Sequence, residues 1–101
     1  MVYLLEEKIS KDKLADFCKN NNIRKLSVFG SFVRGELRPE SDIDILVEFE
    51  PGLTPGLFSI IKMEIELTEL IGRKVDLRTA EDLSKYFRDE VLQNAKLQYQ
   101  A

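Results

Sequence analysis

The sequence predicts one α/β domain of the α+β type, in which a small mixed β-sheet packs on helices on one face and leaves an acidic cleft open on the other. Three observations predict this fold. Helical and strand-like patterns alternate along the chain, and the clearest strand carries apolar and acidic residues by turns. The length of 101 residues suits a single core, so residues 1–101 are expected to form one domain.

The first half of the chain predicts one long helix and two strands. Apolar residues at helical spacing predict an amphipathic helix over residues 11–20, which the asparagines at 20–22 close. Residues 23–29 (IRKLSVF) read as a strand. Gly30 and Ser31 then turn the chain into a short helical segment that ends by Pro39, and residues 42–50 form the clearest strand.

The second half predicts a helix, a strand and a final helical region. Residues 57–71 carry a broad apolar stripe and end at Gly72, a residue suited to a helix C-terminus. Residues 74–78 (KVDLR) read as a short third strand. Thr79 can cap a last helical region, in which apolar residues recur at every fourth position: Leu83, Phe87, Val91 and Ala95.

Composition excludes several function classes. The formal net charge is −3, which disfavours direct DNA or RNA binding. There is no histidine, so serine–histidine and cysteine–histidine catalysis are excluded, and a metal must be bound by carboxylates, as Mg²⁺ or Mn²⁺ would be. The single cysteine, Cys18, reads as a small core residue. No apolar run could span a membrane and no secretory signal is visible, so we expect a cytoplasmic protein.

Two aspartates begin the clearest strand. Because side chains alternate along a strand, Asp42 and Asp44 share one face, with Cα atoms about 6.5–7 Å apart. Asp76 lies on the matching face of the third strand, opposite Val75 and Leu77. Solvated acids at a strand end are the ordinary explanation of a lone D-x-D pair. A third aspartate on the same face favours a site for two divalent cations instead. We expect only water or a ligand to neutralise the three carboxylates if the two strands are neighbours.

The turn at Gly30 and Ser31 is a candidate phosphate site. It follows a strand and opens a helix, where backbone N–H groups are exposed and glycine allows a phosphate to approach. Arg34 lies one turn further and can reach either a phosphate or one of the acids. Ordinary tight turns use the same residues, so this turn alone is weak support. Arg38 reads as a solvated charge, and Ser41 has a supporting role.

These residues together resemble a known family. Gly30-Ser31-x-x-Arg34-Gly35, five further residues and Ser41-Asp42-x-Asp44 are similar to the signature of the DNA polymerase β nucleotidyltransferase superfamily. The small size and the later Val75-Asp76-Leu77 resemble its minimal nucleotidyltransferase branch, whose members often serve as antitoxins to HEPN-domain toxins. The resemblance implies the nucleotidyltransferase fold for the whole chain.

The resemblance also implies an activity, the transfer of AMP from ATP to a hydroxyl acceptor, a tyrosine of a HEPN ribonuclease toxin. Asp42 and Asp44 would hold two Mg²⁺ ions, and Asp76 would bind the catalytic one and help to deprotonate the acceptor. Gly30 and Ser31 would bind the triphosphate. In this reading the protein acts as an antitoxin in a hetero-oligomer with its toxin.

Two alternatives stay open at this point. A non-catalytic nucleotide-binding antitoxin would neutralise its partner by stoichiometric binding. A polymerase or tRNA-modifying enzyme is disfavoured by the acidic balance. Since the chain has no residues left for a second domain, we expect another protein to complete a half-open cleft. Four residues could contact that protein, but core packing is the expected role of each: Leu57, Phe58, Tyr86 and Tyr99.

Overall fold

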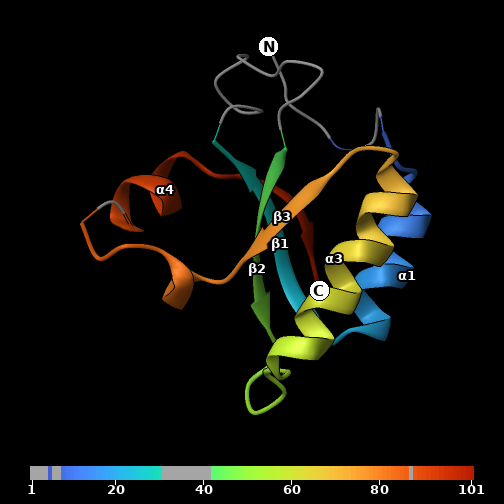
Figure 1. Cartoon of the computed structure of the whole chain (residues 1–101), viewed down its shortest axis with the longest axis horizontal. Helices are drawn as coiled ribbons and strands as arrows, with labels where there is room; N and C mark the ends of the chain where they lie inside the picture. Colours follow the sequence, from blue (N-terminus) through green and yellow to red (C-terminus); the bar gives the residue numbers. More distant parts are fainter. Residues whose placement is uncertain (1–4, 6–7, 31–41, 87) are drawn as a thin grey trace.

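The computed structural model describes residues 5, 8–30, 42–86 and 88–101. Figure 1 shows a central sheet with two helices on one side and a short helix on the other. The elements, in chain order, are α1 (Lys11–Asn20), β1 (Ile23–Phe29), β2 (Ile43–Phe49), α3 (Leu57–Ile71), β3 (Val75–Arg78), the 3₁₀ turn η2 (Ala80–Asp82), α4 (Arg88–Asn94) and β4 (Lys96–Gln100).

The strands form a four-stranded mixed sheet in the order β3-β2-β1-β4. β1 is antiparallel to both of its neighbours, while β2 and β3 run parallel. Along β2, the apolar residues at every second position are all buried: Ile43, Ile45, Val47 and Phe49. They join residues of α1 and α3 in one apolar cluster, so both helices pack on this face of the sheet. The predicted small mixed sheet is therefore confirmed.

Helix α1 has the predicted bounds, and local chemistry explains them. The Ser10 hydroxyl accepts a hydrogen bond from the Lys13 amide at 3.2 Å, which caps the N-terminus. At the other end the Asn21 amide donates to the Phe17 and Cys18 carbonyls. Asn22 then adopts φ 58°, a left-handed conformation that asparagine tolerates and that turns the chain into β1. Cys18 is buried as predicted, and burial raises the pKa of its thiol to about 12.

Helix α3 also has the predicted bounds, but its apolar stripe is only partly buried. Met63, Leu67 and Ile71 pack in the core, and Ile60 packs against it. Three residues of the predicted stripe face solvent: Leu57, Ile61 and Leu70. The reason is that the apolar arc of α3 is wider than the surface that the sheet offers it.

The C-terminal region differs most from the sequence prediction. Thr79 does act as an N-cap, because Thr79 and Asp82 form a reciprocal capping box, but the helix that follows is one 3₁₀ turn. Leu83 is extended (ψ 144°) and buried, which separates η2 from the shorter helix α4. Strand β4, which the sequence analysis missed, pairs with β1.

The expectation of core packing is wrong for three of the four residues named with it. Tyr86 is 97% exposed and Phe58 is 83% exposed, and Leu57 is exposed as well. Tyr99 is partly buried against the core, as predicted. In the part of the chain that the structure describes, no helix combines the length and apolarity needed to cross a membrane. The predicted helical segment between Gly30 and Pro39 lies outside the described residues.

Candidate active site on the open face of the sheet

The parallel pairing of β2 and β3 brings two of the predicted aspartates into register. Asp44 lies opposite Asp76, one step along from the pair formed by Ile43 and Val75. Both aspartates are half-buried while their strand neighbours are fully buried, so they point to the face that α1 and α3 leave uncovered. Asp42, directly before β2, is also half-buried. The predicted shared face of the three acids is consistent with this pattern, and we call it the open face.

Gly30 lies in close contact with the side chain of Asp44. Phe29, the last residue of β1, pairs with Asp44, and Gly30 follows with φ 71°. A Cβ atom at Gly30 would overlap the carboxylate of Asp44. Left-handed backbone already favours glycine, and the close approach of the Asp44 side chain adds to that preference. The turn at Gly30 and the carboxylate of Asp44 are therefore in direct contact.

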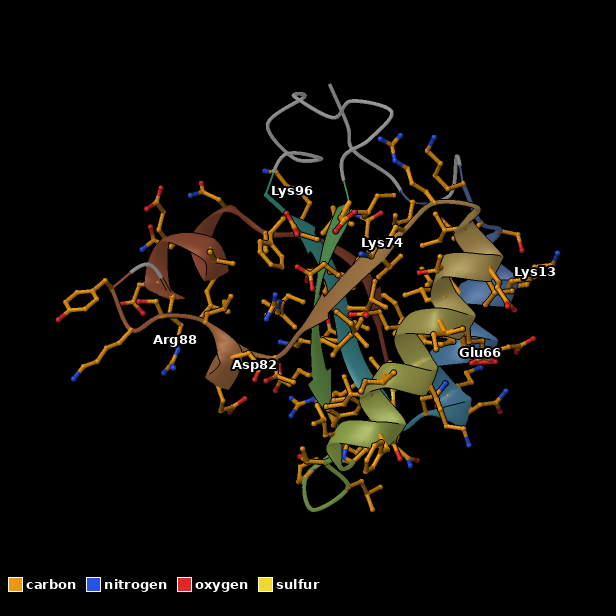
Figure 2. All side chains as sticks on the ribbon, in the orientation of Figure 1. Lys13, Glu66, Lys74, Asp82, Arg88 and Lys96 are labelled. Carbon is orange, nitrogen blue, oxygen red and sulfur yellow. The ribbon has the colours of Figure 1, made fainter. Side chains whose placement is uncertain are left out.

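Two cations neutralise part of the acidic cluster. The Arg78 guanidinium contacts both carboxylate oxygens of Asp76: Nε lies 3.1 Å from Oδ1, and Nη2 donates a hydrogen bond to Oδ2 at 3.2 Å. Lys74, labelled in Figure 2, places Nζ 3.9 Å from Oδ2 of Asp42. The sequence analysis expected only water or ligand to neutralise the acids, which is wrong. The spacing of the residues could have predicted these ion pairs, because Lys74 and Arg78 lie two residues before and after Asp76 and therefore share its face of the strand.

The Asp76–Arg78 pair changes the basicity of its arginine. The hydrogen bond to Asp76, together with the charge of that carboxylate, raises the pKa of the Arg78 guanidinium above its usual value. Both side chains are partly exposed, so the pair contributes little to the free energy of folding, on the order of 0–1 kcal/mol. It does fix the direction in which the Asp76 carboxylate points.

The donor chemistry of the open face fits a hard divalent cation, although its side chains are not gathered around one point. Within the described ranges, no group of three acidic or thiol side chains is close enough together to hold a metal ion. Asp76 and Asp42 are instead turned toward Arg78 and Lys74. Carboxylate oxygens are the ligands that Mg²⁺ prefers.

Helix α3 holds the backbone on either side of Asp76. The Leu77 amide donates to Glu64 Oε2 at 2.9 Å, and the Val75 amide donates to Thr68 Oγ1 at 3.1 Å. Residues four apart on a helix lie about 6 Å apart along its axis, close to the repeat of two residues on a strand, so the two spacings match. Both amides belong to the outer edge of β3, which would otherwise be unpaired. We call these two hydrogen bonds, from Val75 to Thr68 and from Leu77 to Glu64, the edge clamp. The sequence analysis missed the edge clamp because it depends on where α3 packs.

The remaining predicted residues of the phosphate site are not described. Ser31 and Arg34, together with Gly35, Arg38 and Ser41, lie outside the described residues. Of the predicted site residues, the structure therefore places Gly30, Asp42, Asp44 and Asp76, all at one end of the sheet.

Comparison with known proteins identifies the family. The profile described as "Nucleotidyltransferase domain" matches residues 11–97, which is most of the chain. A Methanocaldococcus jannaschii protein, named as a candidate protein adenylyltransferase, is 34% identical over 85 residues, a match covering 84% of this chain and 89% of that protein.

Solved structures of the same fold include toxin–antitoxin complexes. A toxin–antitoxin complex with AMP-PNP superimposes with a TM-score of 0.74 at 21% identity, covering 92% of this chain and 75% of that one. A complex of a tri-AMPylated Shewanella oneidensis HEPN toxin with its minimal nucleotidyltransferase (MNT) antitoxin gives a TM-score of 0.68 at 18% identity, covering 97% and 74%. At these identities the likeness establishes the fold. Together with the profile match over residues 11–97, it shows that this chain belongs to the nucleotidyltransferase domain family of enzymes.

Proposed function

We propose that this protein is a metal-dependent nucleotidyltransferase that moves AMP from ATP to a hydroxyl group of another protein. The observation that carries the proposal is the register of Asp44 and Asp76 on one open face, with Gly30 closed against Asp44. The family match supports the reaction class, and the adenylyltransferase name of the Methanocaldococcus relative supports ATP as the donor.

Each site residue has a role in this proposal. Asp42, Asp44 and Asp76 would hold two Mg²⁺ ions, and Gly30, Ser31 and Arg34 would bind the triphosphate. When bound, the ions would supply positive charge that stabilises the transferring phosphoryl group and the departing pyrophosphate. Asp76 would accept the proton of the attacking hydroxyl. The acceptor oxygen then bonds to the α-phosphorus while the bond to the bridging oxygen breaks, and pyrophosphate leaves.

The acceptor in this proposal is a tyrosine of a HEPN-domain toxin, which AMP transfer would inactivate. Support comes from the Shewanella complex, whose toxin carries AMP groups and is bound by an MNT antitoxin of the same fold. The protein would then be the antitoxin of such a pair and form a hetero-oligomer with its target.

A second candidate function is neutralisation by stoichiometric binding. The observation that favours it is the exposed apolar end of α3, where Leu57 is 70% and Phe58 is 83% exposed. Both modes can exist in one protein. The Asp44→Ala variant separates them, since neutralisation of the toxin that survives this change is binding, and neutralisation that disappears is AMP transfer.

The experiment that tests the proposal is label transfer. The protein is incubated with Mg²⁺ and α-labelled ATP in a lysate of its native host, beside the Asp42→Ala/Asp44→Ala variant. The matched control is Asp16→Ala/Glu69→Ala, which removes two exposed acids away from the open face. We expect label on a discrete protein with the wild type and the control only. No transfer with any of the four nucleoside triphosphates, while a partner still co-purifies, would contradict the proposal and favour the binding antitoxin.

A further inference from the structure

A hollow continues the open face beyond the carboxylates. It has a volume of about 600 Å³ and lies between the sheet and the segment formed by η2 and α4. Figure 2 labels Asp82 and Arg88 on this segment, which leaves the sheet on the side away from α1 and α3. A volume of this size falls within the range of roughly 300–1,000 Å³ that is typical of small-molecule sites.

The hollow starts next to the candidate active site. Leu46 is the next residue after Asp44 on the same face of β2, about 6.5–7 Å further along the strand, and it lines the hollow. Its partner on β1, Ser27, lines the hollow as well. A ligand held over Asp44 can therefore extend into the hollow without crossing a strand.

The lining suits a flat ring that carries polar atoms at its edge. Leu46 is only 9% exposed although it lies outside the main apolar cluster, while Leu92 and Leu97 are 48% and 50% exposed in the described chain. Hydroxyl groups come from Ser27 and Thr79. Three charged residues also line the hollow: Lys25, Glu48 and Glu81. Apolar walls with a few polar groups are what a nucleobase and its ribose require.

The order of the strands decides which part of the reactants enters the hollow. Gly30 lies on the β1 side of Asp44 and Asp76 lies on the β3 side, so the three positions form a line of about 10 Å across the sheet. In phosphoryl transfer the leaving and attacking oxygens lie roughly in line. With pyrophosphate at the Gly30 end, the acceptor hydroxyl approaches over β3, near its proposed base.

The ester oxygen that carries the nucleoside lies outside this line. It is one of the equatorial oxygens of the transition state, so it projects roughly at right angles to the axis of transfer. One of the directions at right angles to this axis runs along β2. In that direction lie Leu46 and the hollow. We propose that the hollow bounded by Ser27, Leu46, Thr79, Leu92 and Leu97 binds the nucleoside of the donor triphosphate, an inference that rests on the proposed function.

Calorimetric titration with two probes tests this assignment. ATP carries the nucleoside and inorganic tripolyphosphate lacks it, and both are titrated with Mg²⁺ into the purified chain. In the Leu92→Gln/Leu97→Gln variant we expect the Kd for ATP to rise by about tenfold or more, because two half-exposed apolar walls become polar. The Kd for tripolyphosphate should stay within about twofold.

A matched control changes the same residue types elsewhere. Leu53 and Leu70 are 50% and 36% exposed and do not line the hollow, so Leu53→Gln/Leu70→Gln should leave both affinities unchanged. A second variant, Ala95→Phe, tests the hollow in a different way, because the larger side chain fills the hollow at the end of α4 and leaves its polarity unchanged. It should weaken ATP binding and spare tripolyphosphate, and its melting temperature checks that it is folded.

The remaining outcomes overturn the inference in distinguishable ways. Unchanged ATP binding in both hollow variants would exclude the nucleoside from the hollow. If ATP binding were unchanged but the KM for the acceptor protein rose, the hollow would hold the acceptor instead. Equal losses for ATP and tripolyphosphate would indicate a general disturbance of the phosphate site. A wild-type chain that binds neither probe with Mg²⁺ would overturn the proposed function itself.

Discussion

The two faces of the sheet are covered to very different extents. On one face, α1 and α3 pack against Ile43, Ile45 and Val47, and in the described chain no polar or charged residue is buried there or elsewhere. On the open face the same strands carry Asp44 and Asp76, covered only in part by η2 and α4. Successive residues of β2 therefore alternate between the apolar core and the open face. Stability and chemistry are separated by the alternation of a strand, so neighbouring substitutions should have opposite effects.

The largest effect is expected from Asp44→Asn. The change removes a carboxylate from the centre of the proposed site, so AMP transfer should fall by roughly 10³-fold, while the melting temperature changes little because the side chain is only half-buried and keeps its size. Label-transfer rates and thermal unfolding measure the two quantities. A variant that kept its activity would remove the open face from the reaction.

The neighbouring substitution Ile45→Ala should show the reverse pattern. Ile45 is fully buried beneath the helices, and its truncation should lower the free energy of unfolding by about 2–5 kcal/mol. Urea unfolding gives this value. Below the unfolding transition the remaining folded protein should transfer AMP at a rate close to that of the wild type, and a large loss of activity in the folded fraction would contradict the separation of the two faces.

A smaller effect is expected from a change to the edge clamp, which joins α3 on the covered face to β3, the strand that carries Asp76 on the open face. Glu64→Ala leaves the Leu77 amide without its acceptor and should cost about 1–3 kcal/mol of stability. Because β3 also carries Asp76, kcat should fall with little change in the KM for ATP. Glu64→Gln keeps an acceptor oxygen and should restore both values, whereas the exposed Glu66→Ala is the control. If Glu64→Gln behaved like Glu64→Ala, charge and not the hydrogen bond would be responsible.

The smallest effect concerns Arg78. Arg78→Met removes a cation that pairs with Asp76, so Mg²⁺ should bind severalfold more tightly, by about two- to tenfold, with little change in stability because the pair is exposed. Titration calorimetry with Mg²⁺ measures the change. Arg24→Met, which breaks the Arg24–Glu48 ion pair instead, should leave Mg²⁺ affinity unchanged. Weaker Mg²⁺ binding in Arg78→Met would contradict the role of Asp76 as a ligand.

The sequence predicts the fold well where apolar periodicity is strong. The bounds of α1, β1 and α3 agree with the prediction, and β2 and β3 differ from it only at their ends. Strand β4 was missed because Lys96–Gln100 contains only two apolar residues and is half-exposed. A four-residue repeat through Leu83 predicted one final helix, but burial of Leu83 in an extended conformation interrupts it.

The site is predictable to the extent that it depends on strand alternation. The period of two along a strand predicts the faces of Asp44 and Asp76 correctly. The same period could have predicted the ion pairs that Lys74 and Arg78 form. The contact between Gly30 and Asp44 requires the register of β1 on β2. The edge clamp and the hollow require the packing of distant helices, which no local pattern contains.

The place of β4 in the sheet has a consequence for folding. β1 pairs with β2 across a short separation, as in Ile23 with Phe49, but Lys25 pairs with Gln100 far along the chain. Closing the longer loop costs more conformational entropy, so β4 should dock after the other strands have formed. Its attachment includes the bond from the Leu5 amide to the Gln98 side chain, at 2.7 Å. We therefore expect the backbone amides of β4 to exchange with deuterium sooner than those of β2, with the wall of the hollow that Leu97 provides opening first.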